Sequence, residues 1–229
     1  MDKSKATINK MVYRPDYKRK VNKAELPTCT ILGTEVVVGN IKWLVEYLTK
    51  NIKELSGDYL TITATNEIIM AYKDDKFFKC QNSGVMSIPD GGPLKTYGQK
   101  KGYTKMERIT GPDLMIELFK ASEGLGLRHY FYGTTQDTLD KMKVKLEKEY
   151  PSLQIAGMRP SRFRNLTEEE NRQTVEEINA TNPDFIWFSL GAPKGNYFAA
   201  NHQGILKGFM MSVGAGFDYY ADNIKRAPM

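Results

Sequence analysis

The sequence predicts an α/β fold of Rossmann-like type, a parallel sheet with helices on both faces, in a chain of 229 residues. Two observations carry this prediction. Residues 185–190 and 209–213 are short apolar runs without polar alternation, which is typical of strands buried on both faces. Segments with apolar residues at helical spacing separate such runs, so helices are expected to connect successive parallel strands.

The first half of the chain is expected to begin with strand, helix and strand. Residues 30–38 are β-branched and apolar, with a turn at Gly33 and Thr34. Apolar residues recur every three or four positions over 41–55, which predicts an amphipathic helix. A strand is expected over 59–65 and a helix directly after it. Open α/β sheets bind their ligands where a strand ends and a helix begins in this way.

The remaining elements follow from periodicity and from helix-capping signals. Residues 87–102 hold prolines and glycines without periodicity, so a loop is expected there. Leu166, Thr167 and Glu170 match a hydrophobic staple residue, an N-cap and its capping-box partner. The other elements expected, in order, are a helix from Gly111, a strand over 128–132, a helix over 139–150, a strand over 154–157, a helix from Thr167, a strand over 185–190, a helix over 197–206 and a strand over 209–213.

Charge and composition limit the cellular compartments and the binding partners that are expected for the chain. The net charge of +6 is concentrated in residues 1–25, which are expected to form a basic arm before a single α/β domain over residues 26–229. Simple solvation, an anionic membrane surface and nucleic acid are three alternatives for this arm. Nucleic acid ranks last, because no pattern of aromatic and basic residues accompanies the charge. Without a membrane-spanning run or a signal peptide, the protein is expected in the cytosol.

The cysteines and histidines are expected to be structural. Cys29 and Cys80 have neither the number nor the spacing of a disulfide framework or a zinc site. His129 and His202 have no cysteine or carboxylate at metal-ligand spacing. The chain also lacks an Asp-x-Asp pair after a strand, so neither a metal nor another cofactor is expected.

Three junctions between strand and helix are rich in small residues. They are Gly133 with Thr134 and Thr135, residues 191–195, and residues 214–218. Small residues let the amides at a helix start approach a phosphate, although parallel sheets need glycines there for steric reasons as well. Three junctions at one sheet edge together favour a nucleotide site. The absence of a Gly-Lys-Ser/Thr phosphate loop and of G-x-G-x-x-G weakens ATPase and dehydrogenase alternatives.

Asp90 is the candidate general base. It lies between Pro89 and Gly91 in the expected loop, where desolvation would raise its pKa, although Pro-Asp-Gly is also a favoured turn sequence. Arg108, Lys194 and Arg226 lie near small residues or proline rather than within long runs of charge. A diphosphate leaving group would need such cations, although each is by default a solvated side chain.

Motifs along nearly the whole chain resemble the WecG/TagA/CpsF family of bacterial glycosyltransferases. The matching residues are Leu32 and Gly33, residues 63–67 with Asn66, Pro89-Asp90-Gly91, Arg108 with Gly111-Pro112-Asp113-Leu114, the Gly133 turn, residues 150–157, Gly191-Ala192-Pro193-Lys194, residues 214–218, and Lys225-Arg226-Ala227-Pro228.

The resemblance implies inverting, metal-independent transfer of an N-acetylmannosamine-type sugar or a hexose from a UDP-sugar to an undecaprenyl-diphosphate-linked saccharide in cell-surface polysaccharide synthesis. The enzyme would act at the inner face of the cell membrane, and a homo-oligomer is left open. By position, Asp90 matches the catalytic base. The residues implied at the substrates are Thr65, Asn66, Arg108, Gly133, Gly191, Lys194, Asn196, Gly214, Asp218 and Arg226.

Two departures from the family pattern qualify these expectations. Gly195 and Asn196 stand where the family usually has Gln-Glu, which puts the donor sugar in doubt and leaves a nucleotide-sugar-binding protein with little or no turnover as the alternative. A basic nucleic-acid-binding domain is a third hypothesis. Family members also continue into a membrane-associating tail, whereas this sequence stops at Met229, so a longer native protein is expected.

Overall fold

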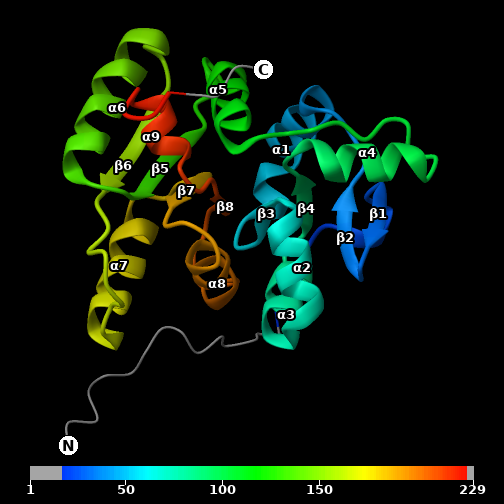
Figure 1. Cartoon of the computed structure of the whole chain (residues 1–229). Coiled ribbons are helices and arrows are strands. Elements are labelled where there is room, and N and C mark those ends of the chain that lie inside the picture. The colour runs from blue at the N-terminus through cyan, green and yellow to red at the C-terminus, as the bar shows by residue number, and fades with distance from the viewer. Residues whose placement is uncertain (1–16, 226–229) are drawn as a thin grey trace, which may run out of the picture.

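A single sheet organises the molecule. The structure, a computed structural model, describes residues 17–225, which contain an eight-stranded sheet in the order β1-β2-β4-β3-β8-β7-β5-β6 (Figure 1). Its strands are β1 (Thr28–Ile31), β2 (Thr34–Val37), β3 (Tyr59–Thr63), β4 (Met86–Pro89), β5 (Arg128–Gly133), β6 (Gln154–Arg159), β7 (Phe185–Ser189) and β8 (Phe209–Ser212). Every neighbouring pair is parallel except the hairpin of β1 and β2. The predicted Rossmann-like α/β class is confirmed.

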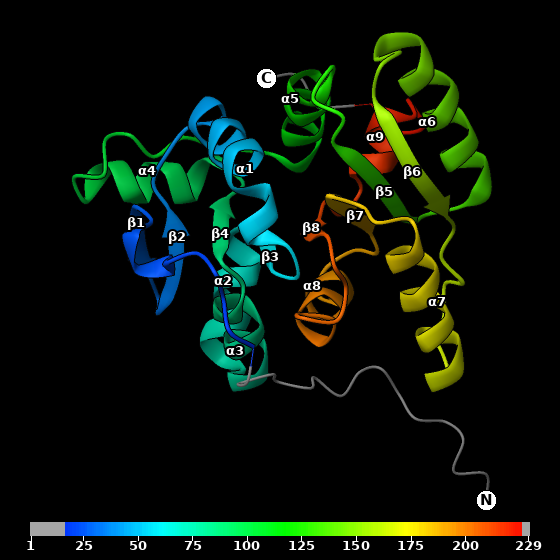
Figure 2. The same ribbon diagram turned by 180° about the vertical axis from the view of Figure 1, so that it is seen from behind.

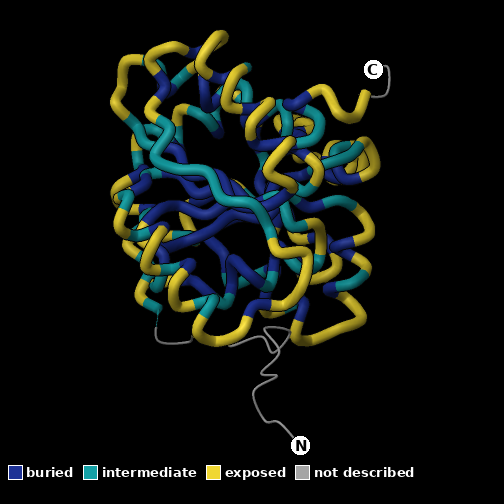
Figure 3. The backbone as a smooth tube through the Cα atoms, turned by 90° about the vertical axis from the view of Figure 1, so that its left-hand side faces the viewer, coloured by how far each residue is buried: buried dark blue, intermediate teal, exposed yellow. Residues whose placement is uncertain are grey.

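Helices cover both faces of the sheet (Figures 1 and 2). One face carries α1 (Ile41–Leu55), α5 (Gly111–Ser122), α6 (Gln136–Glu149) and α9 (Gly216–Tyr220). The other carries α2 (Thr65–Lys73), α3 (Asp75–Ser83), α7 (Glu168–Ala180) and α8 (Lys194–Asn201). A short η1 (Lys23–Glu25) precedes β1, and α4 (Gly92–Lys100) lies beside β1 and β2. In side view the buried strands run between exposed outer segments (Figure 3).

The core forms because the strands are apolar on both faces. On the α5 side, the ring of Phe119 meets Phe131 and Trp187 edge to face, with ring centroids 5.8 and 5.5 Å apart. On the α8 side, Phe198 meets Phe188 at 4.9 Å. Cys80 is buried in this second layer and Cys29 is also buried, as expected of structural thiols. No helix within residues 17–225 combines the length and apolarity needed to cross a bilayer.

The expected loop over residues 87–102 is wrong. The segment contains the end of β4 and all of α4. All four residues of β4 are buried and Pro89 ends the strand, so no alternating pattern could reveal it. Helix α4 begins with Gly92 and Pro93 and buries only Leu94 and Gly98, too few positions to show a helical period.

Other boundaries also shifted. Helix α3 was not expected, α9 begins within the junction expected at 214–218, and α8 begins at Lys194 and ends at Asn201 instead of spanning 197–206. The turn expected within 30–38 is present and separates β1 from β2. The capping box of α7 is confirmed, since Thr167 N donates to Glu170 Oε2 at 2.9 Å and Glu170 N donates to Thr167 Oγ1 at 3.2 Å.

Part of the expected basic arm is built into the fold. Arg19 forms an ion pair with the fully buried Asp58, which also accepts a hydrogen bond from Gln203 Nε2 at 2.9 Å. Lys23 Nζ lies 3.1 Å from Glu35 Oε2. These two cations therefore stabilise the chain before β1. Residues 1–16 of the arm lie outside the described residues.

The two histidines are buried, as expected for structural residues. His202 contacts the carbonyl of Phe198 at 2.7 Å and Asn171 Oδ1 at 2.9 Å. His129 accepts a hydrogen bond from Trp187 Nε1 at 3.0 Å through its Nδ1, and its Nε2 has no partner within the described part of the chain. Burial lowers the pKa of His129 to about 3, so its imidazole is neutral in the folded protein.

This burial predicts a pH-dependent stability. Between about pH 3 and 6.5 the unfolded chain binds a proton at His129 that the folded chain rejects. Stability should therefore fall as the pH drops below 6.5, by about 1.4 kcal/mol per pH unit from this group alone. In His129→Phe, the free energy of unfolding measured with urea should fall less between pH 7 and pH 5 than in the wild-type chain. The difference should be about 2 kcal/mol, the contribution of this one proton between pH 6.5 and 5. An unchanged pH slope would contradict this assignment.

Candidate active site

The carboxyl ends of the parallel strands bring the expected site residues to one edge. Thr63 of β3 pairs in register with Pro89 of β4, and Gly133 of β5 pairs with Ser189 of β7. Between these pairs lies β8, whose Ser212 is in register with β3 and β7. The loops that follow these five strands therefore leave the sheet side by side, which is where open α/β sheets bind ligands.

Asp90, the candidate base, forms an ion pair with Arg108 at this edge. Asp90 N donates to Thr63 O at 2.8 Å, and Ile109 N donates to Pro89 O at 2.8 Å. The chain thus leaves the sheet at Asp90 and returns beside it, which puts Arg108 Nε 3.6 Å from Asp90 Oδ1. Both side chains reach solvent, with 32% of Asp90 and 51% of Arg108 exposed.

The pKa of Asp90 is shifted in the direction a base needs. Partial burial raises the pKa of its carboxyl above the usual value, while the Arg108 guanidinium and the Gly91 amide oppose the rise. The carboxylate can thus accept a proton more readily than a solvated aspartate. Gly91 has a φ of 99° and is the N-cap residue of α4, so the chain bends at Pro-Asp-Gly between β4 and that helix.

Thr65 and Asn66 open helix α2 next to this pair. Both are exposed, two and three residues after the Thr63 carbonyl that holds Asp90. Their neighbour Glu67 is buried and caps the helix, since Ala64 N donates to Glu67 Oε2 at 3.0 Å. Thr65 and Asn66 consequently face solvent at the carboxyl edge.

The three glycines of the expected nucleotide junctions differ in their surroundings. A Cβ on Gly133 would collide with the carbonyl oxygen of Ser189 and lie 2.8 Å from its carbonyl carbon. Gly191 and Gly214 have φ of 71° and 55°, and no atom lies within 4 Å of a Cβ built on either. Gly133 is therefore required by the contact of β5 with β7, whereas the other two border open space.

A buried polar network joins helix α8 to the strand ends beneath Asp90. Asn196 Nδ2 donates to Gln81 Oε1 at 3.3 Å, and Gln81 Nε2 donates to the hydroxyls of Thr61, at 2.8 Å, and of Thr63. Ser87 joins through Thr61 Oγ1 at 2.8 Å. Asn196, expected at the substrate, is thus buried in the fold. Gln81 was not among the expected site residues, and helix α3, which carries it, was not expected, although its buried residues Phe77, Cys80 and Gln81 have helical spacing.

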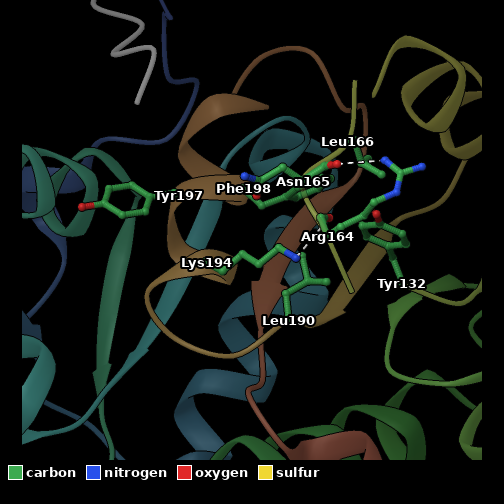
Figure 4. Close-up of a pocket in the computed structure, with 8 residues that line it drawn as sticks. All are labelled: Tyr132, Arg164, Asn165, Leu166, Leu190, Lys194, Tyr197 and Phe198. Carbon is green, nitrogen blue, oxygen red and sulfur yellow. Dashed lines mark hydrogen bonds between the residues drawn. The ribbon is translucent and has the colours of Figure 1, made fainter. Parts of the chain in front are cut away.

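Lys194 begins helix α8 at the same edge. Its Nζ lies 3.5 Å from the carbonyl of Arg164, and Figure 4 shows its side chain directed past Leu190 toward that oxygen. The pocket around it has an internal volume of about 20 Å³, enough for about one water. Tyr132 and Phe198 line this pocket as well, while the ring of Tyr197 points away from it.

Asp218 lies farther along the edge and is held by its own surroundings. Its Oδ1 accepts hydrogen bonds from Thr138 Oγ1 and from Asn223 Nδ2, both at 3.2 Å. These contacts tie α9 to α6. Arg226, also expected at the substrate, lies outside the described residues.

Across residues 17–225, no three His, Cys, Asp or Glu side chains are grouped so that they could hold a metal ion. The structure places Arg108 and Asp113 near the candidate base, and Asp113 has the smaller effect on the pKa of Asp90.

Comparison with known proteins gives a family. A profile described as the glycosyl transferase WecG/TagA/CpsF family matches residues 29–229. The N-acetylglucosaminyldiphosphoundecaprenol N-acetyl-beta-D-mannosaminyltransferase of Bacillus subtilis is 27% identical over 205 residues, 89% of this chain and 78% of that protein. Proteins of the same name from Bacillus spizizenii and Staphylococcus aureus are each 23% identical, over 83% and 86% of this chain and 76% and 77% of theirs. Since the matched region includes the whole sheet edge just described, the chain belongs to the WecG/TagA/CpsF family of glycosyl transferases.

Proposed function

We propose that this chain transfers a sugar from a UDP-sugar to an undecaprenyl-diphosphate-linked saccharide, with Asp90 as the general base. The observation that carries the proposal is the pair of Asp90 and Arg108 at the carboxyl edge of the sheet. There a carboxylate of raised pKa lies beside a cation and beside the exposed start of α2. The names of the relatives support the lipid-linked acceptor and an N-acetylmannosamine-type donor sugar.

The proposed reaction is a single displacement. Asp90 takes the proton of the acceptor hydroxyl, whose oxygen attacks the anomeric carbon of the donor. The bond from that carbon to the diphosphate breaks, and UDP leaves with the electron pair. Attack from the face opposite the leaving group inverts the anomeric configuration. A base raised in pKa by burial favours the first of these events.

The leaving diphosphate would be met by cations and amides. Arg108 is half-exposed beside Asp90, and Lys194 stands at the start of α8. The open backbone at Gly191 and Gly214 lets a phosphate approach. In this scheme the positive charge comes from the protein, so we propose that the reaction needs no divalent metal. We also propose that the reaction takes place at the inner face of the membrane, where a lipid-linked acceptor would be carried.

Turnover should therefore persist without metal ions. The measurement is transfer from UDP-N-acetylmannosamine, and from a panel of other UDP-sugars, to a lipid-linked N-acetylglucosamine acceptor in excess EDTA. Activity should stay within about twofold of that with magnesium, and the product should carry the inverted linkage. Loss in EDTA that magnesium or manganese restores would contradict the metal-free scheme.

The same assay decides the alternative of a binding protein with little turnover. That alternative is favoured by Asn196, which is buried and bonded to Gln81 instead of facing the edge. A chain that binds UDP-sugars but neither transfers nor hydrolyses them, with or without acceptor, would support it against the transferase.

A further inference from the structure

The segment from Gly91 to Glu107 is an excursion between the two residues of the candidate charged pair. It leaves the sheet after Asp90 and returns at Arg108. Helix α4 makes up its first half, at the end of the molecule that carries β1 and β2 (Figure 2). Both ends of this segment are therefore joined to the candidate charged pair.

The inner side of the excursion is fixed to the fold. Leu94 and Met106 are buried in one cluster with residues of β1, β2 and α2. Gln99 Nε2 donates to Met106 O at 3.1 Å, and Gly98 lies so close to Met106 that a Cβ there would collide with its sulfur. The helix and the returning chain are thus held together as one rigid unit.

The outer side is basic and aromatic. We call it the lysine–tyrosine surface, made of Tyr97, Lys100, Lys101, Tyr103 and Lys105, all exposed. Tyr97 and Tyr103 are 42% and 39% exposed. Lys101 Nζ lies 5.8 Å from the centre of the Tyr97 ring. Within the described part of the chain, none of these three lysines forms an ion pair with a carboxylate.

Some cations elsewhere on the described surface are paired with acidic side chains. Lys141, Lys145 and Arg172 each lie within 3.0 Å of an acidic side chain. The three lysines of the lysine–tyrosine surface have no such acidic partner within the described residues, so their charge is available to an anion outside the chain. Tyrosine, with an apolar ring and a polar tip, and lysine, with an apolar stem and a charged head, both suit the boundary between headgroups and acyl chains.

We propose that the lysine–tyrosine surface rests on the anionic headgroups of a bilayer and so presents Asp90 to an acceptor carried in that bilayer. The proposal rests on the proposed function, because only a lipid-linked acceptor requires the base to work beside a membrane. Helix α4 is nine residues long. A helix of that length extends about 14 Å from the chain segment that follows Asp90.

The test compares two charge reversals of equal size in the full chain. Lys100→Glu with Lys101→Glu and Lys105→Glu alters the surface, and Lys143→Glu with Lys148→Glu and Lys207→Glu alters exposed lysines of α6 and the loop before β8. Binding to phosphatidylcholine vesicles containing phosphatidylglycerol, measured by sedimentation, should weaken about 100-fold or more in the first variant, since each of the three lysines near an anionic surface contributes roughly fivefold. The control should stay within about twofold.

A second variant separates a bilayer from a simple anion. Tyr97→Ser with Tyr103→Ser leaves the charge unchanged and should still weaken vesicle binding several-fold. Pure phosphatidylcholine vesicles should bind every variant poorly. The proposal would be overturned if the two triple lysine variants lost vesicle binding equally, or if the variant of the surface lysines bound vesicles as the wild-type chain does. Unchanged vesicle binding in the tyrosine variant would also overturn it.

Turnover distinguishes this proposal from the proposed function. On a water-soluble, short-chain acceptor the surface variants should match the wild-type chain, and on a vesicle-embedded acceptor they should lose the same factor as in binding. If the wild-type chain turns over neither acceptor, the proposed function fails. The order of the variants in vesicle binding would still show whether the lysine–tyrosine surface contacts the bilayer. Normal turnover on vesicles by the surface triple would overturn the surface alone.

Discussion

Asp90→Asn is expected to lower turnover by about 100-fold or more while changing donor binding only a few-fold, the usual scale for removal of a general base. The amide has nearly the same shape but cannot take the acceptor proton. Steady-state transfer and equilibrium binding of the UDP-sugar measure the two effects. Glu107→Gln is the matched control, because it neutralises an exposed carboxylate next to Arg108 and should leave turnover unchanged.

The pH profile strengthens this test. Arg108 lowers the pKa of Asp90, so Arg108→Gln should raise that pKa further and move the acidic limb of the rate profile to higher pH. A carboxylate base is active when ionised, so activity should rise as the pH passes through this pKa. An acidic limb that stays in place in Arg108→Gln, or near-normal turnover in Asp90→Asn, would move the base elsewhere.

Gly133→Ala is expected to lower the free energy of unfolding by about 2–5 kcal/mol, the sum of backbone strain and overpacking. Gly133 has a φ of 128°, and its Cβ would collide with the backbone of Ser189. Because that backbone belongs to β7, relief requires moving two central strands apart. Urea unfolding followed by circular dichroism gives the value.

Gly191→Ala is the matched control for this collision. Gly191 also has positive φ, 71°, but no atom lies within 4 Å of its Cβ position. Only the left-handed conformation should then matter, about 1–2 kcal/mol. If both variants lose the same stability, the packing of β5 on β7 is not what requires Gly133.

Local patterns were sufficient for the elements with strong periodicity. Helix α1 buries Leu44, Leu48 and Ile52 at the spacing that predicted it. Strands β7 and β8 are buried runs whose length and apolar composition predicted them. These elements could be predicted because, in each of them, residues close in sequence all face one continuous core.

The candidate site was predictable only in part. The Pro-Asp-Gly sequence in an expected loop pointed to Asp90, Arg108 was a candidate cation for the diphosphate, and the resemblance placed Arg108 in the same pocket. Their contact depends on a backbone hydrogen bond between Ile109 and Pro89, twenty positions apart, which no local pattern encodes. The roles assigned to Asp90, Arg108 and the other site residues stay predictions until the variants are measured.

The sequence by itself therefore determined the fold class, most of the strands and helices, the family and the candidate base. Only the tertiary structure decided that 87–102 holds a strand and a helix, that Asn196 is buried against Gln81, and that Arg19 serves the fold. The physical reason is common to these cases. Burial, ion pairing and steric contact join residues distant in the chain, and their outcome exists only once the sheet has brought those residues together.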